Sequence, residues 1–146
     1  MKVHNENEEG SAILEFLIIG VLVLVPLLYI MLTVLRLESA VMASTQAARE
    51  AGRAFMMADS TVEARSAAKV AAQLAMSDQG FEMPESALSI TCSQACLSPA
   101  STAHVRIDWR VELPWVPTFL IGDEQGYPIT VDSDLRVDSY RSDGSS

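Results

Sequence analysis

Residues 16–35 of this chain read FLIIGVLVLVPLLYIMLTVL, and they decide the fold because none of them carries a formal charge. At a rise of about 1.5 Å per residue, a helix of this length is about 30 Å long, which matches the hydrocarbon core of a bilayer. The sequence therefore predicts a helix that spans a membrane. Pro26, in the middle of this helix, removes one backbone hydrogen bond, and we expect a bend there.

An acidic side chain stands at the edge of the apolar stretch, where Glu15 directly precedes Phe16. A carboxylate costs about 2.5–3.5 kcal/mol at the centre of a bilayer and less near its boundary. Glu15 is therefore either a boundary residue whose side chain reaches water or a charge with a positive partner. Cleavage after Gly10 would create such a charge on Ser11 and would make Glu15 the fifth residue of the shortened chain.

The net charge and the two cysteines indicate which binding partners and which cellular compartment to expect for this chain. The formal net charge is -9 and lysine and arginine form no cluster, so we expect no binding of nucleic acid. The charges that flank the span do not set its orientation. Cys92 and Cys96 lie in the C-terminal part and favour an oxidising compartment for it. We therefore expect a single-pass protein of the cytoplasmic (inner) membrane, with a cytoplasmic N-terminus and an extracytoplasmic C-terminal domain.

A cleavable signal peptide is the alternative interpretation of the N-terminal segment. Residues 41–43, VMA, resemble the small residues before a signal-peptidase site, which would make Ser44 the new N-terminus. Against this, a signal peptide has an apolar core of about 7–15 residues and a basic beginning. The apolar core here is longer, and the residues before it are more acidic than basic. These features favour a helix that is retained.

Helical sequence continues beyond the span. Ala, Met, Gln, Arg and Glu dominate residues 36–58, so one long helix is predicted over residues 11–58. Ser60 and Glu63 have the spacing of a capping box and predict a second helix that ends near Met76. The apolar residues of this second helix are predicted to face an intramolecular core; they are Val62, Ala67, Val70, Ala71 and Leu74.

Three short segments after Gly80 are typical of strands. Apolar and polar residues alternate over residues 104–113 and 88–92, and also over 129–131 and 135–137, where we expect a break or bulge at 132–134. Three strands favour an antiparallel meander, so the fold class is α+β. The small domain would cover residues 59–140, and residues 141–146 would form a disordered tail.

The apolar segment between two of these strands, residues 114–122, is too rich in proline to be a strand itself. Burial in the core or at the membrane surface is the preferred interpretation, and contact with another subunit is the alternative.

Few residues of the chain indicate chemistry. A disulfide between Cys92 and Cys96 is preferred over a zinc site, because structural zinc takes four ligands and only His104 lies near in the sequence. A calcium site at Asp132 and Asp134 is a weaker possibility, since calcium takes about six to eight oxygen ligands. No phosphate-binding glycine loop, nucleophile elbow or HExxH motif is present. We therefore predict no enzymatic activity, no cofactor and no metal site.

The N-terminal segment resembles a known family. Residues 10–16 read GSAILEF, the apolar span follows at once, and residues 47–51 read AAREA in the helix after it. This combination resembles the type IV pilin-like proteins, and more narrowly the TadE/TadF-like minor pseudopilins of tight-adherence (Flp) pilus systems. The chain differs from the major pilins in its acidic leader and in Ser11, where phenylalanine is common.

The resemblance implies a processing site and a set of partners. In that family a prepilin peptidase removes a short leader, here residues 1–10, and the matching recognition residues are Gly10, Ser11, Glu15 and Phe16. Glu15 would pair with the ammonium group of Ser11 on a neighbouring subunit. The partners would be the lipid bilayer, the prepilin peptidase and other pilins or pseudopilins. The alternative function is a signal-anchored extracytoplasmic binding module, for which the helix is a simple tether.

Overall fold

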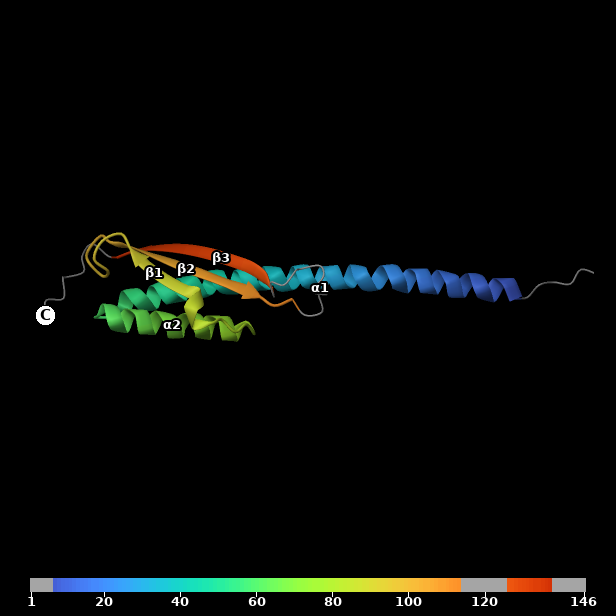
Figure 1. Cartoon of the computed structure of the whole chain (residues 1–146), viewed down its shortest axis with the longest axis horizontal. Coiled ribbons are helices and arrows are strands. Elements are labelled where there is room, and N and C mark those ends of the chain that lie inside the picture. The colour runs from blue at the N-terminus through green and yellow to red at the C-terminus, as the bar shows by residue number, and fades with distance from the viewer. Residues whose placement is uncertain (1–6, 114–125, 138–146) are drawn as a thin grey trace, which may run out of the picture. The chain divides into compact units, whose positions relative to one another are not determined.

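The computed structural model describes residues 7–113 and 126–137, with side chains from residue 12 onward. It has a long N-terminal helix, a shorter second helix and a three-stranded antiparallel sheet (Figure 1). The predicted α+β fold is therefore confirmed. The chain divides into two compact units, Met1–Arg36 and Leu37–Ser146, which are described separately.

Helix α1 runs from Asn7 to Met57, and Pro26 lies within it without interrupting it. Its residues in the first unit are mostly Leu, Ile and Val, and their side chains are exposed. In the second unit the same helix changes composition and becomes a core element. Five of its alanines there are almost completely buried; they are Ala40, Ala43, Ala47, Ala48 and Ala51.

Helix α2, Thr61–Asp78, begins as the sequence predicts. The Ser60 side chain accepts a hydrogen bond from the backbone N–H of Glu63 at 3.3 Å, which caps the first turn. The helix ends two residues beyond the predicted Met76, and Gly80 follows with a positive φ of 75°. This left-handed conformation, which glycine adopts without strain, turns the chain towards the sheet.

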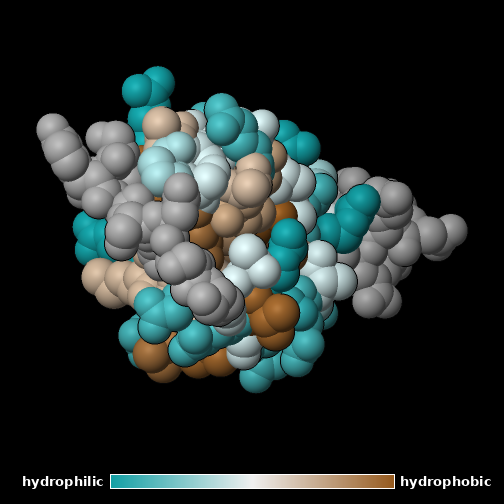
Figure 2. Space-filling model, turned by 90° about the vertical axis from the view of Figure 1, so that its left-hand side faces the viewer, coloured by the Kyte–Doolittle hydropathy of each residue, from teal (hydrophilic) through white to brown (hydrophobic). Residues whose placement is uncertain are grey.

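The predicted core face of α2 is wrong. Val62, Val70 and Leu74 are 80%, 62% and 61% exposed, and a different set of residues is buried: Ala64, Ala68, Ala72, Ala75 and Met76. The buried faces of both α1 and α2 are rich in alanine and belong to the same hydrophobic core. Close packing has therefore selected mainly small side chains on this face, with Met76 as the large exception. The surface itself is mixed in character. In the space-filling view, hydrophobic residues lie among hydrophilic ones at the lower edge (Figure 2).

The sheet has the order β1-β2-β3, and both pairings are antiparallel. Its strands are β1 (Leu88–Cys92), β2 (Thr102–Val111) and β3 (Tyr127–Arg136), and a short 3-10 helix, Glu85–Ala87, precedes β1. The alternation predicted for the central strand is confirmed, because every second residue of β2 is buried; these are Ala103, Val105, Ile107, Trp109 and Val111.

Strand β3 corrects a second expectation, because it has no break at residues 132–134. Asp132, Ser133 and Asp134 pair one to one with successive residues of β2. The two aspartates lie on the outer face, where Arg106 and His104 pair with them across the strands. Polar side chains at these positions are thus compatible with a regular strand, because their partners come from the neighbouring one.

Buried contacts join α1 to the sheet within the second unit. The indole Nε1–H of Trp109 donates to Ser44 Oγ at 2.8 Å, and Ser44 Oγ donates to the carbonyl of Ala40 at 2.7 Å. Further along the helix, Gly52 faces Leu135 of β3 so closely that a Cβ atom at position 52 would overlap the leucine side chain. The helix and the third strand therefore meet where the helix has no side chain.

Candidate functional site

The proposed processing segment lies in the first turns of α1. Gly10 and Ser11 belong to the helix, which begins at Asn7. Glu15 and Phe16 are both exposed, Phe16 to 77%. Because positions four residues apart lie on the same side of a helix, Glu15 shares a helix face with position 11. Residues 1–6, most of the predicted leader, lie outside the described residues.

The Glu15 carboxylate makes no hydrogen bond or ion pair with any side chain in the described part of the chain. Its nearest sequence neighbours on the C-terminal side are all apolar, and the next charged residue is Arg36. An isolated carboxylate beside such a stretch is solvated by water or meets a cation on another molecule.

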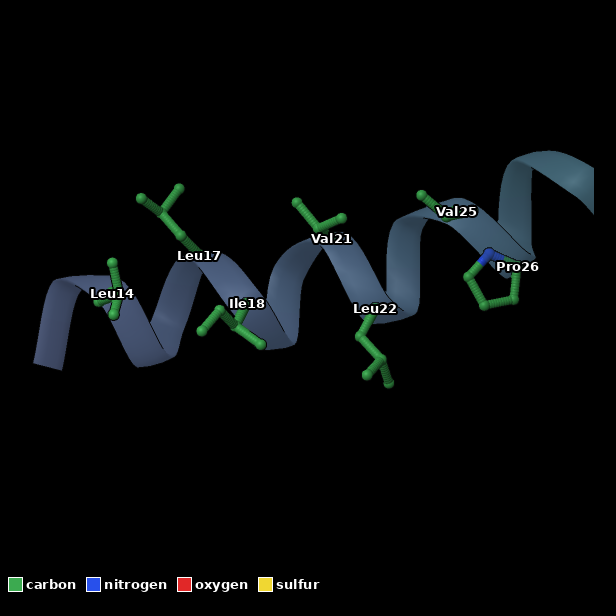
Figure 3. Close-up of a pocket in the computed structure, with 7 residues that line it drawn as sticks. All are labelled: Leu14, Leu17, Ile18, Val21, Leu22, Val25 and Pro26. Atoms are coloured by element: carbon green, nitrogen blue, oxygen red, sulfur yellow. The ribbon is translucent and has the colours of Figure 1, made fainter. Parts of the chain in front are cut away.

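One helix in the described residues is long and apolar enough to cross a membrane. The candidate segment, Ala12–Met57, contains an apolar window that is 0% buried. Figure 3 shows seven residues along its beginning, all of which come from this one helix, so they form an open surface rather than an enclosed cavity. An exposed apolar surface of this extent is typical of a segment that lies in lipid or packs against other helices.

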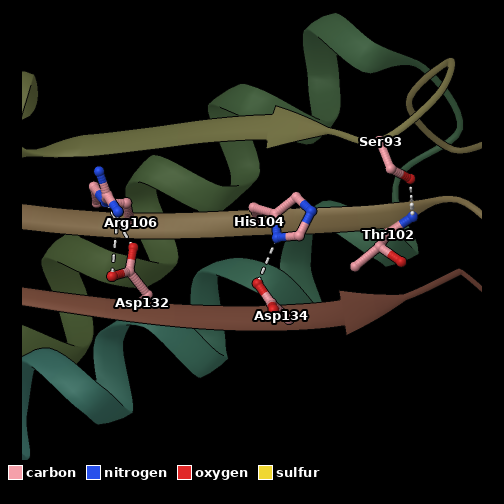
Figure 4. Close-up of polar contacts among 6 residues, drawn as sticks. All are labelled: Ser93, Thr102, His104, Arg106, Asp132 and Asp134. Atoms are coloured by element: carbon pink, nitrogen blue, oxygen red, sulfur yellow. Dashed lines mark hydrogen bonds and ion pairs between the residues drawn. The ribbon is translucent and has the colours of Figure 1, made fainter.

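The outer face of the sheet carries a row of polar pairs (Figure 4). Nδ1 of His104 lies 2.6 Å from Oδ1 of Asp134, and Nε of Arg106 donates to Oδ1 of Asp132 at 2.6 Å. The hydrogen bond from Arg106 lowers the pKa of Asp132 below its ordinary value of 3.8. All four side chains are exposed, so these pairs stabilise the domain only slightly.

These polar pairs do not form a metal site. No group of three or more His, Cys, Asp or Glu side chains in the described part of the chain is placed to hold an ion. Asp132 and Asp134, the residues considered for calcium, lie two residues apart on the outer face of β3, each paired with a basic residue of β2. The outer face of the sheet is therefore an ordinary polar surface exposed to water.

Cys92 and Cys96 are joined by a disulfide at the end of β1, with their Cα atoms 5.4 Å apart. Ser93, inside this short loop, is tied to Thr102 at the start of β2. Its N–H donates to the Thr102 carbonyl, and its Oγ accepts from the Thr102 N–H, both at 2.9 Å. The disulfide and these two hydrogen bonds thus hold the end of β1 against the start of β2.

Sequence reasoning missed the link between Ser44 and Trp109. It treated Ser44 only as the residue after a possible signal-peptidase site, although its hydroxyl is completely buried and bonded to the indole. The two residues are 65 positions apart, and neither lies in a pattern that indicates the other. The apolar segment at residues 114–122 and the tail at 141–146 lie outside the described residues.

Comparisons with models of protein families, with curated protein sequences and with solved structures find no significant match for this chain.

Proposed function

We propose that this chain is a minor pseudopilin that takes part in assembling a tight-adherence (Flp-type) pilus, after a prepilin peptidase removes residues 1–10. The observation that carries the proposal is the position of Glu15. It is the only charged residue between Gly10 and Arg36, and it stands at the beginning of an exposed apolar helix. No described residue neutralises its charge.

The physical argument concerns two charges that are each unfavourable in lipid. Cleavage after Gly10 creates an ammonium group on Ser11, one helical turn before Glu15. When two processed subunits pack side by side, the ammonium of one can pair with the carboxylate of the other, so that the two desolvation costs offset each other. The pair would also fix the axial offset between neighbouring subunits.

The packing of α1 in the second unit favours a helix that stays attached to the domain over one that signal peptidase removes. Ala43 and Ser44, which flank the alternative signal-peptidase site, are 1% and 0% exposed. Cleavage between them would cut α1 in the middle and would remove Ala40, whose carbonyl accepts the hydrogen bond from Ser44. A peptidase that acts on extended, accessible chain would not find such a site in the folded domain.

On this proposal the N-terminus is cytoplasmic, and the domain that contains the disulfide is extracytoplasmic. The bond between Cys92 and Cys96 suits an oxidising compartment. The domain would contact other pilins or pseudopilins, and the apolar helix would hold the subunit in the bilayer until assembly.

The processing step is tested by determining the N-terminus of the full chain in membranes, with and without a prepilin peptidase of a tight-adherence system. We expect the chain to start at Ser11 only when the peptidase is present. Gly10→Leu should block cleavage. Gly20→Leu is the matched control, because a Cβ atom added at Gly20 meets nothing within 4 Å. A start at Met1 in both hosts, or at Ser44, would contradict the proposal.

The role of Glu15 is tested by Glu15→Leu in the same membranes. A helix that serves only as a tether should tolerate leucine and insert at least as well, because a charge has been removed from its apolar edge. A pilus subunit should still insert but should fail to associate with other pilins. Normal association of the variant would favour the anchored binding module.

A further inference from the structure

The two outer strands of the sheet differ in how their free edges are covered. Strand β1 is five residues long, and α2 reaches its outer edge, where the guanidinium of Arg65 donates to the carbonyl of Ile90 at 3.4 Å. Strand β3 is ten residues long, and in the described ranges its one hydrogen-bonded neighbour is β2 (Figure 1). A long edge strand without a cover is a template for pairing with another chain.

The hydrogen bonds at one end of the sheet show which residues of β3 face outward. In an antiparallel pair, residues whose backbone groups bond across the pair alternate with residues whose groups point away. The N–H of Val137 donates to the carbonyl of Ser101 at 2.8 Å, so the backbone groups of the preceding Arg136 point away from β2. Thr102, opposite Arg136, agrees with this, because its N–H and its carbonyl both bond Ser93 on the side of β1 (Figure 4).

The alternation continues along β3 and leaves a row of outward backbone groups. The strand pairs one to one with β2 throughout, so every second residue points the same way. We call the row the β3 edge; it consists of Thr130, Asp132, Asp134 and Arg136. None of its N–H and carbonyl groups bonds another part of the chain that the structure describes. Pro128 ends the row, because proline has no N–H to offer.

The side chains beside the β3 edge indicate which sequence fits it. On the inner face, Val131 and Leu135 are partly buried and pack against the core, so apolar residues of an added strand would extend that core. On the outer face, the side chains of Asp132 and Asp134 are 56% and 64% exposed. A carboxylate accepts about four hydrogen bonds, so their bonds to β2 leave sites free for another donor. The edge therefore suits a strand in which apolar residues alternate with basic ones.

A second copy of this chain is a poor occupant of the β3 edge. Ser44 of α1 bonds Trp109, which lies opposite the beginning of β3, and Gly52 lies against Leu135 near the end of β3. The helix and the strand therefore run in the same direction within the second unit. Antiparallel pairing of two β3 strands would turn the α1 helices of the two domains in opposite directions. This arrangement disfavours two copies that are anchored from the same side of one bilayer.

We propose that the β3 edge binds an extended segment of a different protein, which adds an antiparallel strand beside β3. Antiparallel pairing continues the pattern of the sheet and is slightly more stable per residue than parallel pairing. The basic residues of the segment would lie beside Asp132 and Asp134 and bond the edge through their backbone groups, and the apolar residues between them would cover Val131 and Leu135. Main-chain bonds give such a complex its affinity, and the alternation gives it specificity. The proposal does not depend on removal of residues 1–10 or on assembly into a pilus.

The test uses the full chain in detergent micelles and a short labelled peptide in which valine and lysine alternate. Two N-methylated peptides are the matched controls, because they have the same charge and side chains. Methyl groups on the lysine nitrogens of the backbone remove the N–H groups that bond the β3 edge, whereas methyl groups on the valine nitrogens lie on the side that faces away. We expect the lysine-methylated peptide to bind at least about tenfold more weakly than the other two. Equal binding of all three peptides would overturn the proposal.

Amide hydrogen exchange, measured by NMR on the same sample, locates the bound peptide. In the free chain the N–H groups of the β3 edge should exchange fast, whereas those of Val131, Ser133 and Leu135, which face β2, should be protected. Peptide at about ten times its dissociation constant should slow exchange at the edge about tenfold. Protection of the edge in the free chain would show that another part of the chain covers it, and would overturn the proposal. Exchange that stays fast when peptide binds would do the same.

A pair of variants tests the preference for basic residues. Asp134→Asn should weaken binding of the unmodified peptide about threefold, because one attraction across the strands is lost. Asp108→Asn is the matched control, since it makes the same change on the central strand β2 rather than at the edge, and it should leave binding unchanged. Equal losses in the two variants would show only a general attraction between a basic peptide and an acidic protein, and would reject the proposal.

Discussion

Phe16 and Phe55 belong to the same helix, α1, yet they lie in opposite environments. Phe16 is 77% exposed in the first unit, where the neighbouring apolar side chains are also large and exposed. Phe55 is 0% exposed in the second unit, among alanines that bring the packed elements close together. The comparison teaches that hydrophobicity alone does not identify the core of this protein. In the second unit, alanines bring the packed elements close together around large side chains such as Phe55, whereas the large apolar side chains of the first unit have no such packing and remain exposed.

The largest expected effect separates these two phenylalanines directly. Phe55→Ala should lower the free energy of unfolding of the C-terminal domain by about 3–5 kcal/mol, because it leaves a cavity in a packed core. Phe16→Ala is the matched control and should leave that free energy almost unchanged. Thermal and denaturant unfolding of the full chain in detergent would measure both. Equal losses in the two variants would mean that the two regions do not differ as described.

A smaller effect tests how α1 is held to the sheet. Ser44→Ala should cost about 1–3 kcal/mol of unfolding free energy, because the buried N–H of Trp109 loses its acceptor. Thr45→Ala is the control on the next residue, whose hydroxyl makes a similar bond to the Val41 carbonyl at an exposed position. The same unfolding measurements apply, and a Thr45→Ala loss as large as that of Ser44→Ala would argue against the buried bond.

The smallest expected effect concerns the outer face of the sheet and is a dependence on pH. The pKa of Asp132 is lower in the folded state than its ordinary value of 3.8, because of the bond from Arg106. Its contribution to stability is therefore present above the ordinary value and is lost as the pH falls through the lowered one. Asp132→Asn should remove this part of the acid dependence of the unfolding midpoint. An identical acid profile in the variant would show that the pair contributes nothing measurable.

The fold was predictable where the pattern is local. The alternation of β2 and the cap at Ser60 depend on neighbouring residues, and both are confirmed. The buried face of α2 was not predictable from residue size, because the packing of the folded core buries Ala68 and leaves the larger Val70 exposed. The continuity of β3 was missed for a similar reason. Asp132 and Asp134 suggested a break, and the basic residues that accommodate them lie 26 and 30 positions away.

In the candidate site, too, features set by local sequence were predictable and features set by tertiary contacts were not. The spacing of Gly10, Glu15 and the apolar stretch is visible in the sequence alone, whereas the bond between Ser44 and Trp109 spans 65 positions and needed the folded domain. Local spacing therefore indicates the proposed processing segment, whereas the burial of Ala43 and Ser44, which flank the alternative cleavage site, is seen only in the folded domain.

Gly52 marks the point where α1 lies closest to Leu135 of the sheet. Leu135 of β3 occupies the space that any other residue at position 52 would fill. A one-residue insertion or deletion in the helix before this point would present Ala51 or Arg53 to the leucine instead, and the Leu135 side chain would have to turn aside. Length changes in the second unit's part of α1 should therefore be tolerated far less than substitutions on its outer side.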